Sequence, residues 1–405
     1  MELMDLRQLG YAYEEAKVLA VEGEKLLFSI AEKRQDEWWY SLISYDRERG
    51  QGQTLYGYPI LKDTFWSQKE RIVGDCVTIV NLSLSKEIEV YQVNTQSGQL
   101  MGEHHLKVKE EIGSTMIAIN QRYFLFNVDV EESEEDSSSY YRENKLDFFY
   151  YLCDLEEDRL YLLKVLCLLE GLSVVHGLID ELPLIREQQE EYVVFNACHM
   201  EDYEYEEIYE LVESKALLHE QVKEKEGLYF IPVEALVKAI KSEATHLPFR
   251  TIRERHLDGW VRYLGREGQK VYYREKDFRT QEEVIYSIKL PSLEEQEEYR
   301  LDAKAIKGHL FYRIKEAYEE ERDAHEVRIR RLTSPRRELG VIKEANGTFQ
   351  AYIEERYRVT SWWTEEEKGE EWDYKEFTTL LDTLTGESHN YERGHQLFGN
   401  TLILY

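Results

Sequence analysis

A short turn motif recurs along this chain, and it limits the possible folds more than any other feature of the sequence. The motif reads Asp or Asn, three residues, Gly, and then Gln or Glu, at Asp46–Gln51, Asn94–Gln99 and Asp382–Glu387. Asp154–Arg159 is a looser copy with Asp158 in the glycine position. An Asp or Asn side chain caps such a turn by accepting from backbone amides, and Gly or Asp tolerates the positive φ that leads into the next strand. Repeated copies therefore predict repeated hairpins.

The segments before each turn have the composition of β-strands. A run rich in aromatic and β-branched residues precedes the turn, as in Trp38–Ile43, and a second apolar run lies further upstream. Seven such upstream runs are present: Lys25–Ile30, Cys76–Val80, Tyr123–Val128, Tyr192–Phe195, Lys270–Tyr273, His309–Ile314 and Tyr357–Thr360. The outermost clear turns, at positions 46 and 382, are 336 residues apart, so six intervals average 56 residues. A four-stranded propeller blade needs roughly 40–50 residues, so insertions account for the excess.

These features predict an all-β fold in which residues 1–405 form a single β-propeller domain. We expect about seven four-stranded blades, with six or eight as alternatives. With strands lettered A to D from the centre outward, the upstream runs are assigned to A and the motif to the B–C turn. The apolar segments Ala16–Val21 and Leu397–Tyr405 are expected to close the ring, because an open sheet edge invites aggregation.

The segment Leu380–Glu387, which reads Leu-Leu-Asp-Thr-Leu-Thr-Gly-Glu, resembles the strand and turn of quinoprotein-type and related β-propeller repeats. This resemblance implies a propeller fold and no particular activity. The resemblance alone admits a quinone cofactor, but enzymes of that type are generally exported and the first residues show no leader. We predict no cofactor.

Charge and cysteine usage restrict the partners. The formal net charge of −30 disfavours nucleic-acid backbones and anionic membrane surfaces, and is compatible with a basic protein or peptide. The first residues lack the pattern of a signal peptide, and charged residues interrupt the apolar stretch Leu160–Ile179. The four cysteines form no CxxC pair, which favours reduced core cysteines. We therefore expect a cytoplasmic protein, with a monomer favoured and the oligomeric state open.

The excess length is concentrated in four acidic segments. We predict loop insertions between strands A and B near residues 129–147, 200–227, 316–323 and 364–373, and a short helix within the second. Such loops would all emerge on one face of the disc and make it acidic. Within the first, Asp129–Asp136 is either a solvated loop or a weak divalent-cation site, and it lacks the ligand spacing of an EF-hand.

Tryptophans supply the candidate binding residues. They are Trp38, Trp39, Trp362, Trp363 and Trp372. If the first and last blades were neighbours, these rings would form a groove for a ligand or peptide, because large rings give contact area at low entropy cost. The alternative is packing between blades. Trp66 and Trp260 are interpreted as core or loop packing.

Linear motifs of catalysis are absent. The chain contains no phosphate-binding loop, dinucleotide fingerprint, HExxH or GxSxG. His104 and His105 lack a partner at metal-ligand spacing, so we predict no catalytic residue and no metal site. The sequence thus favours a non-enzymatic binding or scaffold propeller that recognises a protein or peptide through its acidic loop face. The alternative is a hydrolase or other enzyme that acts on a carbohydrate or small polar substrate in the central channel.

Overall fold

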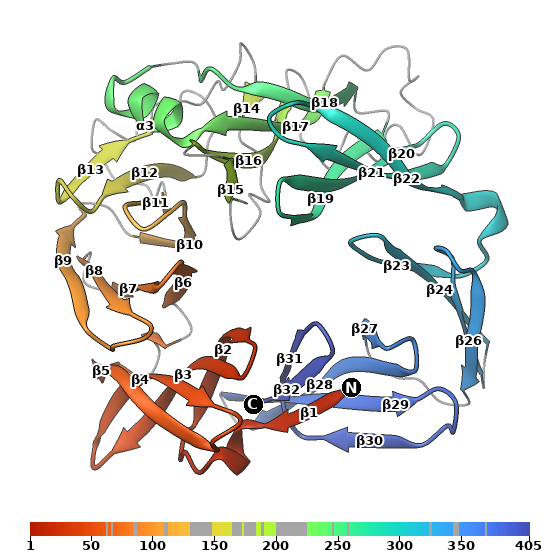
Figure 1. The fold of residues 1–405 in the computed structure, drawn as a ribbon, viewed down its shortest axis with the longest axis horizontal. Helices are drawn as coiled ribbons and strands as arrows, with labels where there is room; N and C mark the ends of the chain where they lie inside the picture. Colours follow the sequence, from red (N-terminus) through yellow and green to blue (C-terminus); the bar gives the residue numbers. More distant parts are fainter. Residues whose placement is uncertain are drawn as a thin grey trace.

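Eight β-sheets surround a central opening in the computed structural model (Figure 1). The structure describes residues 1–405 except 62–63, 66–67, 84–86, 109–111, 130–147, 164–171, 174–183, 188–189, 200–224, 245–246, 257–258, 324–325, 343–347 and 369–370. Each sheet is one blade, so the protein is a β-propeller as predicted. The predicted count of about seven blades is wrong, and the alternative of eight is the count observed.

In blades 1–3 and 5–7, four consecutive strands form the blade, and the first of them lies nearest the opening (Figure 1). Blade 1 contains β2 (Glu15–Glu22), β3 (Lys25–Arg34), β4 (Glu37–Asp46) and β5 (Gln51–Ile60). Blade 2 contains β6 (Lys69–Val73), β7 (Cys76–Ser83), β8 (Glu87–Asn94) and β9 (Leu100–Lys107). Blade 3 contains β10 (Ile112–Ala118), β11 (Tyr123–Asp129), β12 (Phe148–Asp154) and β13 (Arg159–Leu162). Blade 4 has five strands, because β14 and β15 both pair with β16. Its strands are β14 (Leu172–Ser173), β15 (Leu184–Glu187), β16 (Glu190–His199), β17 (Lys225–Pro232) and β18 (Arg250–His256).

The remaining blades complete the ring. Blade 5 contains β19 (Gly259–Glu267), β20 (Lys270–Asp277), β21 (Glu282–Lys289) and β22 (Glu294–Asp302). Blade 6 contains β23 (His309–Arg313), β24 (Glu316–Arg322), β25 (Val327–Arg331) and β26 (Arg337–Ile342). Blade 7 contains β27 (Thr348–Ile353), β28 (Tyr357–Lys368), β29 (Glu371–Asp382) and β30 (Ser388–Tyr391). Short 3-10 helices lie at Leu6–Leu9 and Ala303–Ala305.

Blade 8 is built from both ends of the chain, which explains the error in the count. It has three strands, β31 (His395–Phe398), β32 (Thr401–Leu404) and β1 (Glu2–Asp5), and β1 pairs with β32 in parallel. The C-terminal apolar segment therefore closes the ring as predicted, but its partner is Glu2–Asp5. Ala16–Val21 belongs to β2 of blade 1. Strands of four residues carry too few positions for a periodic pattern, so sequence alone reads them as a closing strand and not as a further blade.

The turn motif behaves as its chemistry predicts. Asn94 Oδ1 accepts from the amides of Gln96 and Ser97 at 3.0 and 2.8 Å, and Asp382 Oδ1 accepts from that of Leu384 at 3.0 Å. The glycine positions have φ of +63° to +73°, and Asp158 of the looser copy has φ +49°. The motif joins the third strand to the fourth, however, and not the second to the third.

The predicted strand letters are thus shifted by one in most blades. The upstream apolar runs are mostly second strands, such as β3 and β7, and they are apolar because the neighbouring blades cover both of their faces. The innermost strands face the opening on part of their surface, so their composition is mixed. The sequence pattern therefore does not identify them as strands.

The predicted acidic insertions fare differently. Residues 130–147 and 200–224, with the predicted helix, lie outside the described residues; Asp129 ends β11 and Lys225–Gly227 begin β17. Glu316–Arg322 is strand β24 and not a loop. Residues 364–373 are mostly the paired ends of β28 and β29. Sequence reasoning failed at β24 because its acidic run looked solvated, whereas Glu319 and Glu320 are buried against arginines.

The core lies between adjacent blades. Clusters of buried aromatic and aliphatic side chains join neighbouring sheets, as where Phe230 of blade 4 meets Tyr273 of blade 5. The α-helix of the described residues, α3 (Val233–Lys241), buries Leu236 and Ile240 in the cluster shared by blades 3 and 4. Burial of roughly 25 cal/mol per Å² of apolar surface makes these inter-blade clusters the main source of stability.

Candidate functional site

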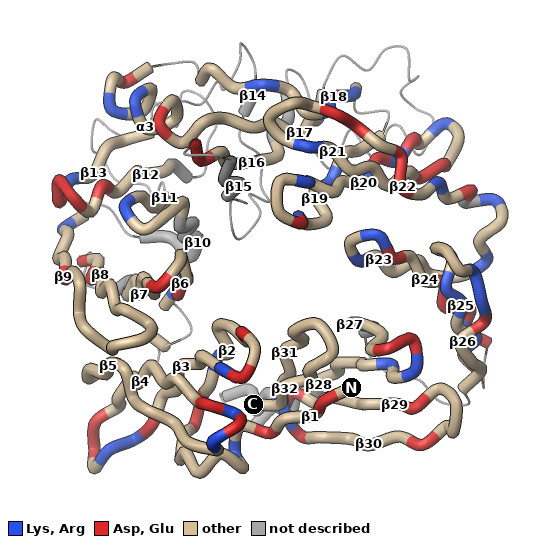
Figure 2. The backbone as a smooth tube through the Cα atoms, in the orientation of Figure 1, with Lys and Arg blue, Asp and Glu red and all other residues tan. Residues whose placement is uncertain are grey.

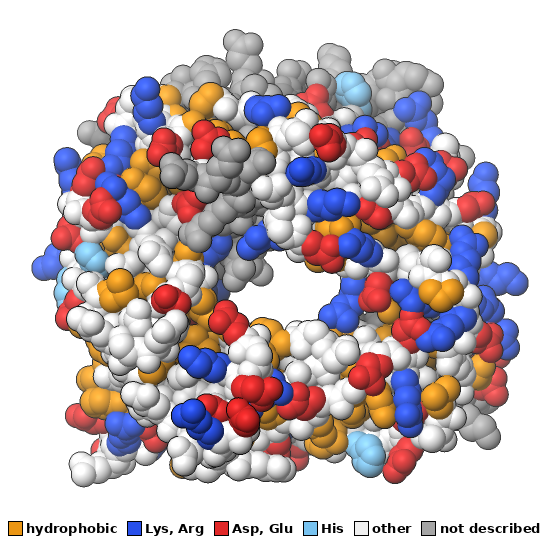
Figure 3. Space-filling view, viewed as in Figure 1, with side chains coloured by type: hydrophobic (Ala, Val, Ile, Leu, Met, Phe, Trp, Pro, Cys, Tyr) orange, Lys and Arg blue, Asp and Glu red, His pale blue; other side chains and the backbone are white. Residues whose placement is uncertain are grey.

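The centre of the ring is open to solvent, and charged side chains lie around it (Figure 3). Charged residues also lie within the strands of blades 5 and 6, where β25 alone carries three arginines (Figure 2). A polar boundary between these two blades has two distinct features. One is a cluster that extends outward from the innermost strands β19 and β23, and the other is a surface cavity.

The channel-wall cluster is defined here as Trp260, Arg262, Arg274, Lys276, Glu283 and Tyr312, from β19, β20, β21 and β23. Side chains alternate along a strand, so residues two apart share a face. Val261 and Tyr263 of β19 pack in the cluster shared with blade 4. Trp260 and Arg262 therefore face blade 6.

Arg274 occupies the middle of this cluster. Its guanidinium carbon lies 4.3 Å from the ring centroid of Trp260 and 4.0 Å from that of Tyr312. The exposed guanidinium of Arg262 also lies over Trp260, at 5.4 Å. Cation–π contacts of this kind hold a guanidinium in place without neutralising its charge.

The charge of the cluster is unbalanced. Glu283, with 9% of its side chain exposed, is 3.9 Å from Arg274 and 3.5 Å from Lys276, and it accepts a hydrogen bond from the Tyr312 hydroxyl. One carboxylate thus faces three cations among the described residues. Arg274 Nε is buried and has no hydrogen-bond partner within this part of the chain. In a protein of net charge −30, a local excess of positive charge beside the opening is unusual.

Burial changes the acid–base properties of the cluster. Desolvation lowers the pKa of Arg274 below its ordinary value, and the neighbouring Arg262 acts in the same direction. An anion placed beside Arg274 would relieve both effects. Burial and the hydrogen bond to Glu283 raise the pKa of Tyr312. This phenol is therefore protonated at neutral pH and acts as a donor.

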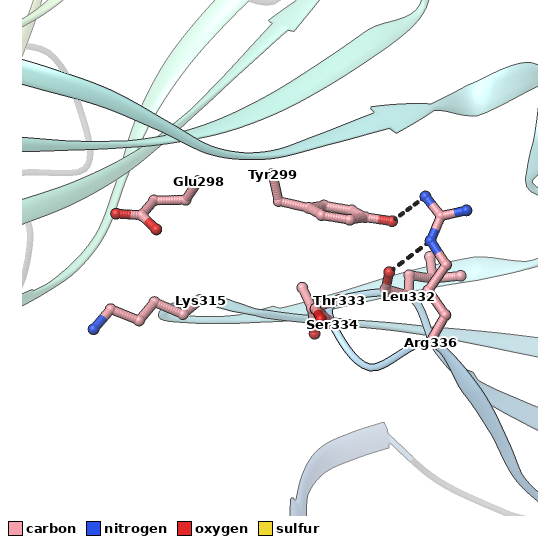
Figure 4. Close-up of a pocket in the computed structure, with 7 residues that line it drawn as sticks. All are labelled: Glu298, Tyr299, Lys315, Leu332, Thr333, Ser334 and Arg336. Carbon is pink, nitrogen blue, oxygen red and sulfur yellow. Dashed lines mark hydrogen bonds between the residues drawn. The ribbon is translucent and has the colours of Figure 1, made fainter.

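A cavity of about 300 Å³ opens further along the same boundary (Figure 4). Its walls come from β22, from the hairpin between β23 and β24, and from the turn between β25 and β26. The lining residues are Glu298, Tyr299, Lys315, Leu332, Thr333, Ser334 and Arg336. This volume is at the lower end of the range for small-molecule sites.

The tryptophans chosen from the sequence lie on two separate blades. Trp38 and Trp39 are on β4 of blade 1, where the guanidinium of Arg34 lies 4.8 Å from the Trp39 ring. Trp362 and Trp363 are on β28, and Trp372 is on β29, in blade 7. Blade 8 stands between blades 1 and 7, so the expected shared groove does not form across a direct seam.

The two tryptophans of β28 differ in environment. Trp362 stacks on Phe377 with centroids 4.1 Å apart and planes at 9°, and its Nε1 donates to Thr379 at 2.9 Å. This arrangement is that of a packed side chain. Trp363 is 52% exposed. A binding role for the five tryptophans stays a prediction.

Sequence reasoning missed the channel-wall cluster. The sequence indicates packing for Trp260 and gives no signal for a role of Arg262 or Tyr312. The sequence contains one signal of it, because Arg274 directly follows the apolar run Val271–Tyr273. A charged residue beside a buried run costs free energy unless it has a partner. The meeting of Arg274 with Tyr312 was beyond reach, because it depends on the register of two different blades.

Within the described residues, no group of three or more His, Cys, Asp or Glu side chains has the arrangement of a metal site. No helix there is long and apolar enough to cross a membrane. His104 instead pairs with Asp158, and His105 Nε2 lies 3.1 Å from Glu103 Oε1.

The chain matches no family model and no curated protein. Several solved structures resemble it in fold. A prolyl endopeptidase has 10% identity and a TM-score of 0.42, over 93% of this chain and 49% of the endopeptidase, so the chain spans about half of that protein. An uncharacterised protein from Listeria monocytogenes EGD-e has 10% identity and a TM-score of 0.41, over 94% and 95% of the two chains. The β-propeller domain of the Trilobed protease from Pyrococcus furiosus has 8% identity and a TM-score of 0.39, over 93% and 97%.

These comparisons contradict the prediction of a non-enzymatic scaffold that binds a partner through an acidic loop face. Peptidases and proteases recur among the solved structures that resemble the chain. The prediction also loses part of its structural basis, because residues 316–323 and 364–373 belong mainly to paired strands. At 8–10% identity the likeness itself concerns the fold alone.

Proposed function

We propose that the central channel is the substrate site of an enzyme that acts on a small polar molecule carrying an anionic group. The observation that carries this proposal is the channel-wall cluster, where three cations and two aromatic rings meet one carboxylate beside the opening. A carboxylate or phosphate of the substrate supplies the missing negative charge.

The cluster assigns different roles to its two arginines. Arg262 is exposed at the wall and makes the first contact with an anion from solvent. Arg274 is largely buried, with 19% of its side chain exposed, so its interaction with the anion is less screened by water. The rings of Trp260 and Tyr312 fix the Arg274 guanidinium before the substrate arrives, which reduces the entropy lost on binding.

The same cluster contains a pair able to transfer a proton. The Tyr312 hydroxyl donates to the Glu283 carboxylate, and both groups lie within the charged environment of Arg274. A phenol and a carboxylate held in this way are suited to general acid–base catalysis of a hydrolytic reaction. Hydrolysis is therefore the reaction class that we propose for the substrate bound at this wall.

Binding is tested by titration calorimetry with inorganic phosphate and with succinate as probes. The variants are Arg262→Met and Arg274→Met, and Arg300→Met on the outer strand β22 is the matched control for charge. We expect saturable binding that weakens about tenfold or more in the first two variants and is unchanged in the control. Binding that ignores both channel arginines contradicts the proposed site.

Catalysis is tested separately on a panel of chromogenic esters, phosphates and glycosides, each in a neutral and an anionic form. We expect turnover of an anionic member that Glu283→Gln and Tyr312→Phe both reduce by about 100-fold or more. Probe binding without turnover of any member contradicts hydrolysis while leaving the binding site intact. Turnover that survives both substitutions contradicts the assigned roles.

A further inference from the structure

The cavity between blades 5 and 6 has a polar character at both ends (Figure 4). At one end, Glu298 of β22 and Lys315 of the turn between β23 and β24 extend in the same direction. At the other end, the Tyr299 hydroxyl accepts from Arg336 Nη2 at 3.0 Å. The hydroxyls of Thr333 and Ser334 lie between the two ends on one wall.

The carboxylate of Glu298 is held by its own blade. Its Oε1 accepts from Ser287 Oγ at 2.6 Å and lies 3.9 Å from Lys270 Nζ. With 18% of its side chain exposed, Glu298 is partly shielded from solvent. One oxygen is thus fixed by Ser287, and Oε2 has no hydrogen-bond partner among the described residues. This arrangement is suited to accepting from a ligand hydroxyl.

Arg336 is oriented in a similar way. Its Nε donates to the carbonyl of Leu332 at 3.0 Å, and its guanidinium carbon lies 5.7 Å from the Tyr299 ring centroid. These contacts use Nε and Nη2, so Nη1 is left for a ligand within the described part of the chain. A guanidinium anchored in this way recognises a carboxylate or phosphate with little loss of its own freedom.

Lys315 has a backbone conformation that is unfavourable for a residue with a side chain. Tight hairpins after the innermost strands of blades 1, 2, 5 and 8 carry a glycine with φ of +56° to +60°, at Gly23, Gly74, Gly268 and Gly399. The corresponding hairpin of blade 6 places Lys315 at φ +62° instead. Side chains rarely adopt this conformation, which the corresponding hairpin of blade 7 also has at Glu354 and Glu355. The ammonium of Lys315 pairs with Glu267 at the rim of the cavity.

We propose that this cavity is a second binding site, separate from the channel, for a hydroxyl-rich molecule that carries one anionic group, such as a sugar phosphate or a sugar acid. Glu298 and Lys315 contact the ligand hydroxyls at one end of the cavity, and Arg336 binds the anionic group at the other end. With Glu267 and Lys270 included, three cations face two carboxylates, and the net positive charge favours an anionic polyol over a neutral one. Thr333 and Ser334 add neutral donors along the wall.

Titration calorimetry with glucose 6-phosphate, glucose and inorganic phosphate tests this proposal. We expect saturable binding of glucose 6-phosphate with a Kd of about 1 mM or below, and binding of glucose and of phosphate at least about tenfold weaker. Equal binding of phosphate and glucose 6-phosphate contradicts recognition of the hydroxyls. Absence of binding by glucose 6-phosphate and by glucuronate overturns the proposal.

Lys315→Gly is the decisive variant, because glycine adopts φ +62° without strain and the fold should be retained. We expect it to weaken glucose 6-phosphate binding by about tenfold while the melting temperature stays level or rises. Glu298→Gln and Arg336→Met are expected to weaken binding similarly, and Arg328→Met on β25 is the matched control. Binding that is unchanged in Lys315→Gly and Arg336→Met overturns the assignment to this cavity. Arg262→Met should leave this binding intact, so failure here and failure of the channel site are distinguishable.

Discussion

Replacement of Arg358 by Met should destabilise the protein severely, because it removes one partner of a buried ion pair between two blades. Arg358 on β28 and Glu320 on β24 have 2% and 0% of their side chains exposed, and Arg358 Nε donates to Glu320 Oε1 at 2.5 Å. Arg358 Nη1 also donates to Thr360 Oγ1. The variant leaves the Glu320 carboxylate buried without its main partner.

The expected size of the loss follows from this geometry. Removal of one partner of a buried pair costs about 3–5 kcal/mol. Arg322 Nη2 remains 3.2 Å from Glu320 Oε2 and offsets part of that loss. We therefore expect the lower end, about 3 kcal/mol, for Arg358→Met. The double variant Glu320→Gln with Arg358→Met removes the charge as well, and it should be more stable than the single variant by about 1–2 kcal/mol.

Urea unfolding followed by tryptophan fluorescence measures these differences. The free energy of unfolding is compared at equal slope for the wild type, both single variants and the double variant. A loss below about 1 kcal/mol for Arg358→Met, or strict additivity in the double variant, would refute the argument, because either result means that the buried charge is compensated in some other way.

Three further predictions concern pH and the turns. Burial lowers the pKa of His395 to about 4, so the unfolded state takes up this proton at a higher pH than the folded state. Up to about 3 kcal/mol of stability is therefore lost as the pH falls from about 6.5 to 4. In His395→Gln, the free energy of unfolding should depend less on pH across that window. Although burial raises the pKa of Asp154, hydrogen bonds from Arg122 and Lys241 hold it at about 2. Stability of about 2 kcal/mol is therefore present above pH 4 and lost towards pH 2, and Asp154→Asn should abolish that step in acid titration followed by circular dichroism. A Cβ at Gly98 would lie 2.8 Å from a backbone oxygen of Leu55, whereas one at Gly386 meets open space, and both have positive φ. Gly98→Ala should therefore lower the free energy of unfolding by more than the roughly 1 kcal/mol expected for Gly386→Ala, and equal losses would contradict the steric argument.

The sequence predicted the fold where the relevant physics is local. The capped turn at Asn94 and Asp382 forms as expected, because a side chain and the amides that follow it are covalently near. The eighth blade was not predicted, because β1 and β32 pair from opposite ends of the chain and no local pattern relates them. The position of each strand within its blade was not predicted, for a related reason. Burial identifies the second and third strands, while the innermost strand is defined by the opening.

The candidate site could not be predicted, because its residues are joined only by the register between blades. Arg274 and Tyr312 belong to different sheets, and no spacing along the chain relates them. Glu319 and Glu320 illustrate the opposite error. In the sequence they belong to an acidic run, whereas in the structure they are buried beside Arg330 and Arg358. A charged residue in a strand is thus informative only when the neighbouring blade is known.

The most direct test of the channel-wall cluster is a crystal structure determined after a soak in tungstate, an electron-dense oxyanion that reports anion sites by anomalous scattering. The account predicts a tungstate peak at the wall of the opening, within hydrogen-bond distance of Arg262 and Arg274, and its loss in crystals of Arg274→Met. A wild-type structure with tungstate bound elsewhere and none at this wall would contradict the proposal that the central channel receives an anionic substrate.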